Sequence, residues 1–126
     1  MRPTTKPLLT PLLALGLCAL VAAAPIYAQG YSFLKYAPER YFQDGDWRLM
    51  QEAVQEALDT RADGESVQWA NQATGCSGTV TALKAVPSES GKDCRSARIA
   101  NRAPKATSES EHRFCRDEGG DWKVAD

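Results

Sequence analysis

The side chains with the widest chemical repertoire in this sequence of 126 residues are four cysteines and a single histidine. Thiolate and imidazole groups can form a nucleophilic pair or share a zinc ion. Zinc sites usually draw their ligands from two closely spaced pairs, and His112 with Cys115 is the one close pair in this chain. A thiol or metal protein that uses Cys76 and His112 is therefore an alternative interpretation and not the leading one.

Disulfide formation is the more ordinary use of these thiols. In an exported protein, which the N-terminus of this chain predicts, cysteines reach an oxidising compartment and pair by default. Cys94 and Cys115 each lie in one of two consecutive predicted strands, so we expect them to pair and Cys76 to remain a free thiol. Closing a loop of about 20 residues contributes roughly 3 kcal/mol in the chain-entropy model, a large share of the stability of a small domain.

Two arginines, Arg95 and Arg116, directly follow the two paired cysteines. If the strands adjoin, their guanidinium groups can lie on one face, together with Arg98 or Arg113. Such a patch can bind a carboxylate, a phosphate or a sugar acid. Ion pairing with nearby acidic residues is the competing interpretation, and the candidate partners are Asp93, Glu111, Asp117 and Glu118.

Residues 1–28 have the composition of a secretory signal peptide. Two basic residues precede an apolar run over residues 8–24, and Ala28 offers a small residue for cleavage. A retained membrane anchor would need about 20 apolar residues, and this run is shorter. Lipidation at Cys18 is a further alternative, although the bulky Leu17 directly before it makes a poor lipobox.

The charge and motif content of the remaining chain excludes several classes of function. Cleavage after Ala28 leaves 98 residues with 13 basic and 16 acidic side chains, a net charge of −3. Such a chain has no general attraction to polyanions, so nucleic acid is not an expected partner. It also lacks a phosphate-binding glycine loop, a pair of catalytic carboxylates and a histidine-rich metal tract. We therefore expect no enzymatic activity, no metal and no cofactor.

Residues 29–45 form an N-terminal arm that is unusually rich in aromatic side chains: Tyr31, Phe33, Tyr36, Tyr41 and Phe42. A solvated linker would not carry so many. They either pack on the following domain or form an exposed patch for an envelope partner.

The elements of the domain, residues 46–126, follow from periodicity. An amphipathic helix is predicted over residues 46–60, capped by Asp44 or Asp46. Alternating residues predict a hairpin over residues 66–83 with its loop at 71–78. Further strands are predicted at 93–102, 112–116 and 122–124. The predicted core comprises Trp47, Met50, Val54, Leu58, Val67, Trp69, Val80, Ile99, Phe114, Trp122 and Val124.

These elements predict an α+β fold in which one amphipathic helix packs on a small antiparallel sheet of four or five strands, within residues 66–125. A sheet of this size buries only a modest core, so the disulfide matters to its stability.

A set of short motifs accompanies these elements: Gly64-x-x-Val67-x-Trp69-x-Asn71, Thr74-Gly75-x-x-Gly78-x-Val80-Thr81, Cys94-Arg95, Cys115-Arg116 and Gly120-x-Trp122. Over residues 57–126 the set resembles the C-terminal domain of the 17-kilodalton outer-membrane surface antigen family of Gram-negative bacteria. The resemblance implies an envelope protein and carries over no catalytic residues. Many relatives have a lipid-modified cysteine and a glycine-repeat apolar segment before the domain, whereas here the lipobox is poor and that segment is absent. The family's turn usually has a polar residue such as Asn in place of Cys76.

The sequence therefore predicts an exported, non-enzymatic protein of the periplasm or outer membrane, without a transmembrane segment in the mature chain. It would bind, or associate structurally with, an envelope protein or surface component. One alternative is a soluble periplasmic accessory module that binds an anionic small molecule or a glycan. The second alternative is the thiol or metal protein built on Cys76 and His112.

Overall fold

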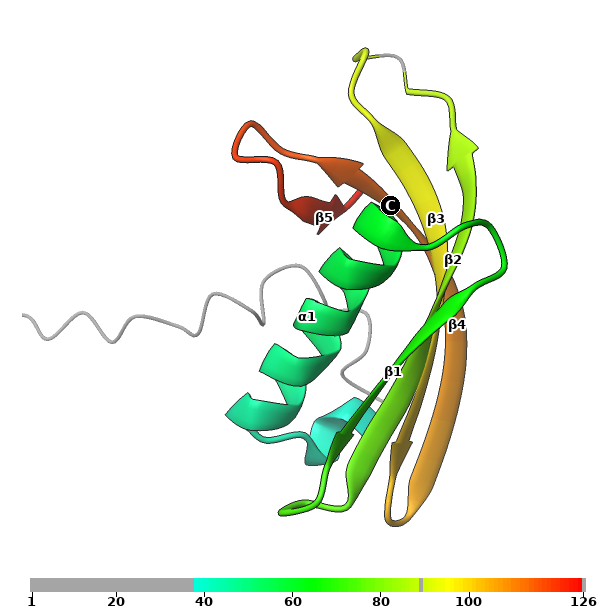
Figure 1. The fold of residues 1–126 in the computed structure, drawn as a ribbon. Coiled ribbons are helices and arrows are strands. Elements are labelled where there is room, and N and C mark those ends of the chain that lie inside the picture. Colours follow the sequence, from blue (N-terminus) through cyan, green and yellow to red (C-terminus); the bar gives the residue numbers. More distant parts are fainter. Residues whose placement is uncertain (1–37, 89, 126) are drawn as a thin grey trace, which may run out of the picture.

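The computed structural model of this chain describes residues 38–88 and 90–125. The elements in chain order are η3 (Pro38–Tyr41), α1 (Asp44–Thr60), β1 (Ser66–Asn71), β2 (Cys76–Val86), β3 (Cys94–Ala103), β4 (Ala106–Arg116) and β5 (Trp122–Val124). The five strands form one antiparallel sheet in sequence order, and α1 lies across one side of it (Figure 1). This confirms the predicted α+β fold. We call the side under α1 the helix face and the other side the open face.

Helix α1 forms because its apolar side chains recur on one stripe that faces the sheet. It ends at Thr60, as predicted, but begins at Asp44, two residues earlier than predicted. The capping residue is Gln43 and not an aspartate. Asp46 lies in the first turn, where its carboxylate accepts the Gln43 backbone N–H at 2.9 Å.

The first hairpin has a shorter loop than the sequence indicated, because β2 begins at Cys76. Gly75 adopts a φ of 72°, a left-handed conformation that glycine tolerates and that reverses the chain within a few residues. Its N–H donates to the Asn71 carbonyl at 2.9 Å. The hydroxyl of Thr74 accepts the Cys76 N–H at 3.3 Å.

Strand β4 is longer than predicted, because residues 107–111 belong to it and not to a loop. Their polar composition conceals the strand. One set of alternate side chains lies on the solvated open face, and on the helix face Ser108 donates to Glu39 of η3 at 2.9 Å. A strand whose two faces are both polar shows no hydrophobic alternation.

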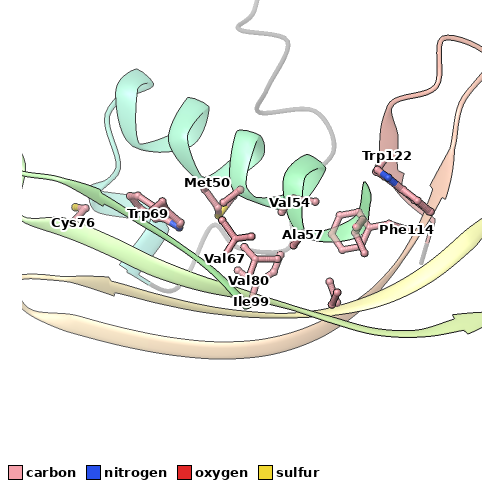
Figure 2. Packing of buried hydrophobic residues seen from close by; sticks show 14 of the residues in the cluster. Met50, Val54, Ala57, Val67, Trp69, Cys76, Val80, Ile99, Phe114 and Trp122 are labelled. Carbon is pink, nitrogen blue, oxygen red and sulfur yellow. The ribbon is translucent and has the colours of Figure 1, made fainter. Parts of the chain in front are cut away.

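The core lies between α1 and the sheet. Figure 2 shows Met50, Val54 and Ala57 of the helix directed at Val67 and Val80 of the first hairpin. The predicted core is confirmed except at Trp47 and Val124, which are only partly buried. Burial of each large apolar side chain contributes about 1.5–3 kcal/mol.

The aromatic arm is described only from residue 38. Phe42 packs edge-on against Trp47 and Trp69, with ring centroids 5.4 and 5.3 Å apart. This residue therefore belongs to the packed domain, whereas Tyr41 is 42 % exposed. Tyr31, Phe33 and Tyr36 lie outside the described residues, as do the predicted signal peptide and Cys18.

Candidate functional site

The predicted disulfide joins Cys94 of β3 to Cys115 of β4, and these residues face each other in the register of the two strands. The N–H of Arg116 donates to the Asp93 carbonyl at 2.8 Å. The cysteines therefore occupy the adjacent non-hydrogen-bonded pair, where opposing Cα atoms approach most closely. Their Cα atoms are 4.0 Å apart. The bridge thus fastens β3 to β4 near one end of the sheet.

Arg95, on the helix face, binds the protein's own backbone. Its guanidinium donates to the Leu58 carbonyl at 2.8 Å and to the Arg61 carbonyl at 2.9 Å. These carbonyls lie at the C-terminal end of α1, where carbonyls lack helical partners and attract cations. The guanidinium also donates to the Leu83 carbonyl at 2.9 Å, at the point where the register of β2 with β3 shifts. In addition it forms an ion pair with the Asp63 carboxylate at 3.0 Å.

Arg116, also on the helix face, connects α1 to β5. Its guanidinium stacks on the Trp122 ring at 4.5 Å and donates to Asp59 Oδ1 at 2.7 Å. The Trp122 indole N–H donates to the same carboxylate oxygen at 2.9 Å. Of the partners expected from the sequence, Asp93 lies 4.0 Å away.

The larger basic patch predicted from the sequence does not assemble, because the strand period places Arg98 and Arg113 on the open face. Arg95 and Arg116 do share a face, but they donate to carbonyls and carboxylates of the domain. Anion binding by this pair stays a prediction. The sequence did not reveal Asp59 and Asp63 as partners, since both belong to a distant part of the chain.

Cys76 and His112 lie at different places in the sheet. Cys76 begins β2 next to Ser77, which pairs with Arg102, whereas His112 pairs with Ala97. Extending the register places Cys76 opposite Ala103, which lies six residues from Ala97 along β3, roughly 20 Å. Among residues 38–88 and 90–125, no group of three histidine, cysteine or acidic side chains could hold a metal ion.

The Cys76 thiol itself is 2 % exposed. Burial raises its pKa, the negative charge of Asp46 and a hydrogen bond to that carboxylate raise it further, and the hydrogen bond with Thr74 lowers it. The thiol is therefore protonated at neutral pH and is a poor nucleophile or metal ligand.

Asp46 is the centre of a buried polar cluster that the sequence did not identify as such. Its side chain is fully buried and accepts hydrogen bonds from Asn71 Nδ2 at 2.8 Å and Thr74 Oγ1 at 2.7 Å. The cluster ties the β1–β2 turn to the start of α1, which gives Asn71 and Thr74 of the sequence motif a structural role.

Gly78 of the same motif provides space on the helix face. A Cβ atom there would lie 2.4 Å from Trp69 Nε1 and 2.4 Å from Asn101 Oδ1. Because Gly78 has no side chain, the Trp69 indole and the Asn101 amide can both lie over its backbone. Asn101 then donates to the buried Glu39 carboxylate at 2.7 Å and so holds η3 on the domain.

A shallow depression of about 740 Å³ lies on the open face, and because most of the residues lining it are polar we call it the polar depression. Two rows of side chains border it, and each row consists of residues that face one another across β1, β2, β3 and β4. One row is Gln68, Thr79, Ala100 and Glu109, and the other is Ala70, Ser77, Arg102 and Thr107. Small side chains and the Gly78 backbone form its floor. We take it as the candidate binding surface; sequence reasoning missed it because its residues come from four strands.

Comparison with known proteins identifies the family of this chain. No curated protein and no solved structure matches the chain. A family model described as 17 kDa outer membrane surface antigen matches residues 56–123, which run from α1 to β5 and make up more than half of the sequence. The matched region includes the motif whose asparagine, threonine and glycines hold the first hairpin under α1. The protein therefore belongs to the 17 kDa outer membrane surface antigen family.

Proposed function

We propose that the protein is exported to the bacterial envelope and acts there without catalysis, by binding or associating with a surface component. The family membership supports the envelope location. The disulfide between Cys94 and Cys115 supports it independently, because such bonds persist in oxidising compartments. No helix among the described residues is long and apolar enough to span a bilayer.

The polar depression on the open face is the observation that carries the binding role. The hydroxyl groups of Ser77, Thr79 and Thr107 can each donate and accept hydrogen bonds, and the Gln68 amide does both. A polyhydroxylated ligand has the same mixture of donors and acceptors. We propose that the ligand is a glycan segment of the envelope, lying across β1 to β4.

Titration of the isotopically labelled, processed chain with envelope glycan fragments tests this role by NMR. The amide signals of Thr79, Ala100 and Thr107 should shift on binding. Thr79→Val keeps the shape of the side chain but removes the hydroxyl, so affinity should fall about fivefold, which corresponds to one hydrogen bond of ~1 kcal/mol.

Thr81→Val is the matched control for this experiment. Thr81 is on the same face and strand, but its hydroxyl bonds to Ser66 at 2.7 Å and does not border the depression. Glycan affinity should be unchanged in this variant. An equal loss in both variants, or no shift with any glycan, would remove the glycan role.

A second candidate function is the binding of an anionic group at the β3–β4 turn. Arg102 and Lys105 have no ion-pair partner among the residues that the structure describes, and with Thr107 they line a hollow of about 490 Å³. Binding at this turn would weaken with salt and be lost in Arg102→Gln, because exposed charges are screened. A salt-independent ligand would favour the glycan role instead.

A further inference from the structure

The edge of the sheet at β1 has free backbone groups. Ala82 N–H donates to the Glu65 carbonyl at 2.9 Å, which makes these residues a hydrogen-bonded pair of the antiparallel ladder. By alternation, Val67 and Trp69 bond to β2. The N–H and C=O groups of Ser66, Gln68 and Ala70 therefore point away from the sheet. Figure 1 shows β1 as an outermost strand.

Within Ser66–Asn71 this edge lacks the usual protection of an edge strand, and a bulge lies only at its start, where Ala82 accepts the Gly64 N–H and donates to Glu65. Strand β1 contains no charged residue, no proline and no bulge. The other long free edge is β4, because β5 pairs only with residues 114–116. There the outward positions include Glu109 and Glu111, whose charges discourage strand pairing. One edge is thus protected by charge and the other is open.

We infer that β1 pairs with β1 of a second copy of this chain, antiparallel and about a two-fold axis at Gln68. This register places Gln68 opposite Gln68 of the second copy and Ser66 opposite its Ala70. It pairs all three outward-facing residues, for six backbone hydrogen bonds in total, two for each facing pair. A register shifted by two residues leaves one of the three unpaired.

The charge pattern around the axis favours this occupant. Glu65 falls opposite Asn71 of the second copy, so no like charges face each other between the two strands. The two-fold symmetry is that of most homodimers. The pairing would form one sheet of ten strands and, because Gln68 and Ala70 border the polar depression, would join the depressions of both copies.

Sedimentation velocity of the processed chain tests the inference at protein concentrations up to about 1 mM. A dimer with a dissociation constant above that concentration would be too weak to matter. Gln68 is exposed and supports nothing in the fold, so Gln68→Lys should fold normally. It should weaken self-association about tenfold or more, because two lysines then face each other at the axis. Gln68→Glu should do the same, and an equimolar mixture of the two variants should recover the dimer.

Hydrogen exchange locates the contact. The amides of Ser66, Gln68 and Ala70 should become protected as the concentration rises, and those of Glu109 and Glu111 should not. Glu109→Lys, on the other edge, should leave self-association unchanged. A chain that stays monomeric at about 1 mM would overturn the inference. Protection of the β1 amides only after an envelope extract is added would also overturn it, by assigning the edge to another protein.

Discussion

Arg95 Nη1 of β3 lies 2.8 Å from the carbonyl oxygen of Leu58, in the last turn of α1. One side chain of the sheet thus closes the C-terminal end of the helix. The neighbouring Cys94 holds the same strand to β4 on the opposite face. The Cys94-Arg95 dipeptide of the family motif therefore joins three elements of the fold.

Replacing this arginine should destabilise the domain more than a typical surface change. Arg95→Met leaves the carbonyls of Leu58, Arg61 and Leu83 without their donor, and the free energy of unfolding should fall by about 2–3 kcal/mol. Urea denaturation measures this loss. Arg98→Met is the control, because Arg98 is 46 % exposed and its acidic partners are 3.8 Å away. Equal effects in the two variants would contradict the capping role.

The disulfide should contribute strongly to stability. Cys94→Ser combined with Cys115→Ser should lower the free energy of unfolding by about 3 kcal/mol, because the unfolded chain regains the freedom of the open loop. Intact mass after alkylation should show one free thiol in the native processed chain. Three reactive thiols in protein taken directly from the envelope would contradict the bridge.

Stability should depend on pH through Cys76. The thiol pKa is raised in the folded state, so the unfolded chain releases this proton at a lower pH. The free energy of unfolding should therefore fall as the pH rises above the ordinary thiol pKa of about 8.5. Cys76→Ala should remove that part of the slope, measured by urea denaturation across the alkaline range. An identical slope in the variant would assign the dependence to other groups.

The Asp46 cluster should hold the first hairpin on α1. Asp46→Ala leaves the donors of Asn71 and Thr74 unpaired in a buried site, and should cost about 2–3 kcal/mol of stability. Asp44→Ala removes an exposed carboxylate from the same helix turn and should cost about 0.5 kcal/mol. Thermal denaturation of the two variants gives the comparison. Similar melting temperatures would show that the cluster adds nothing beyond the favourable position of an acid at a helix start.

Gly78 should not accept a side chain. In Gly78→Ala the added Cβ would meet Trp69 Nε1 and Asn101 Oδ1 at 2.4 Å, and the backbone oxygen of Ala100 at 2.8 Å. The overpacking should cost about 1–3 kcal/mol. Gly119→Ala is the control, since its nearest contact is 3.4 Å. The near-ultraviolet circular dichroism spectrum, which reports on the tryptophan environment, should change only in the Gly78→Ala variant.

Periodic patterns carried most of the information about the fold. The four-residue spacing of Met50, Val54 and Leu58 located the helix, and the alternation of Val67 and Trp69 located the first strand. Such patterns record burial on one side of an element, so they also identified the large apolar side chains of the core, but not the small buried ones such as Ala82 and Ala97. They failed along residues 107–111, where both faces of β4 are polar and no alternation exists.

The candidate site was less predictable, because its contacts join residues far apart in the chain. The sequence indicated Arg95 as a cation but not that helix carbonyls would surround it. It likewise did not indicate that Asp46 lies below the β1–β2 turn, or that an arm residue, Glu39, is buried against Asn101. Each of these roles depends on which strand the helix crosses, and side-chain type and spacing do not contain that information.

The sequence by itself determined the helix, the antiparallel sheet, the Cys94–Cys115 pairing and the family, because these rest on periodicity, on the succession of strands along the chain and on short motifs. Only the tertiary structure decided which polar groups are used within the fold and which remain available. Arg95 and Arg116 turn toward α1, whereas the depression and the β1 edge face solvent. The physical reason is that a strand alternates its side chains between two faces, and the packing of the helix decides which face is buried.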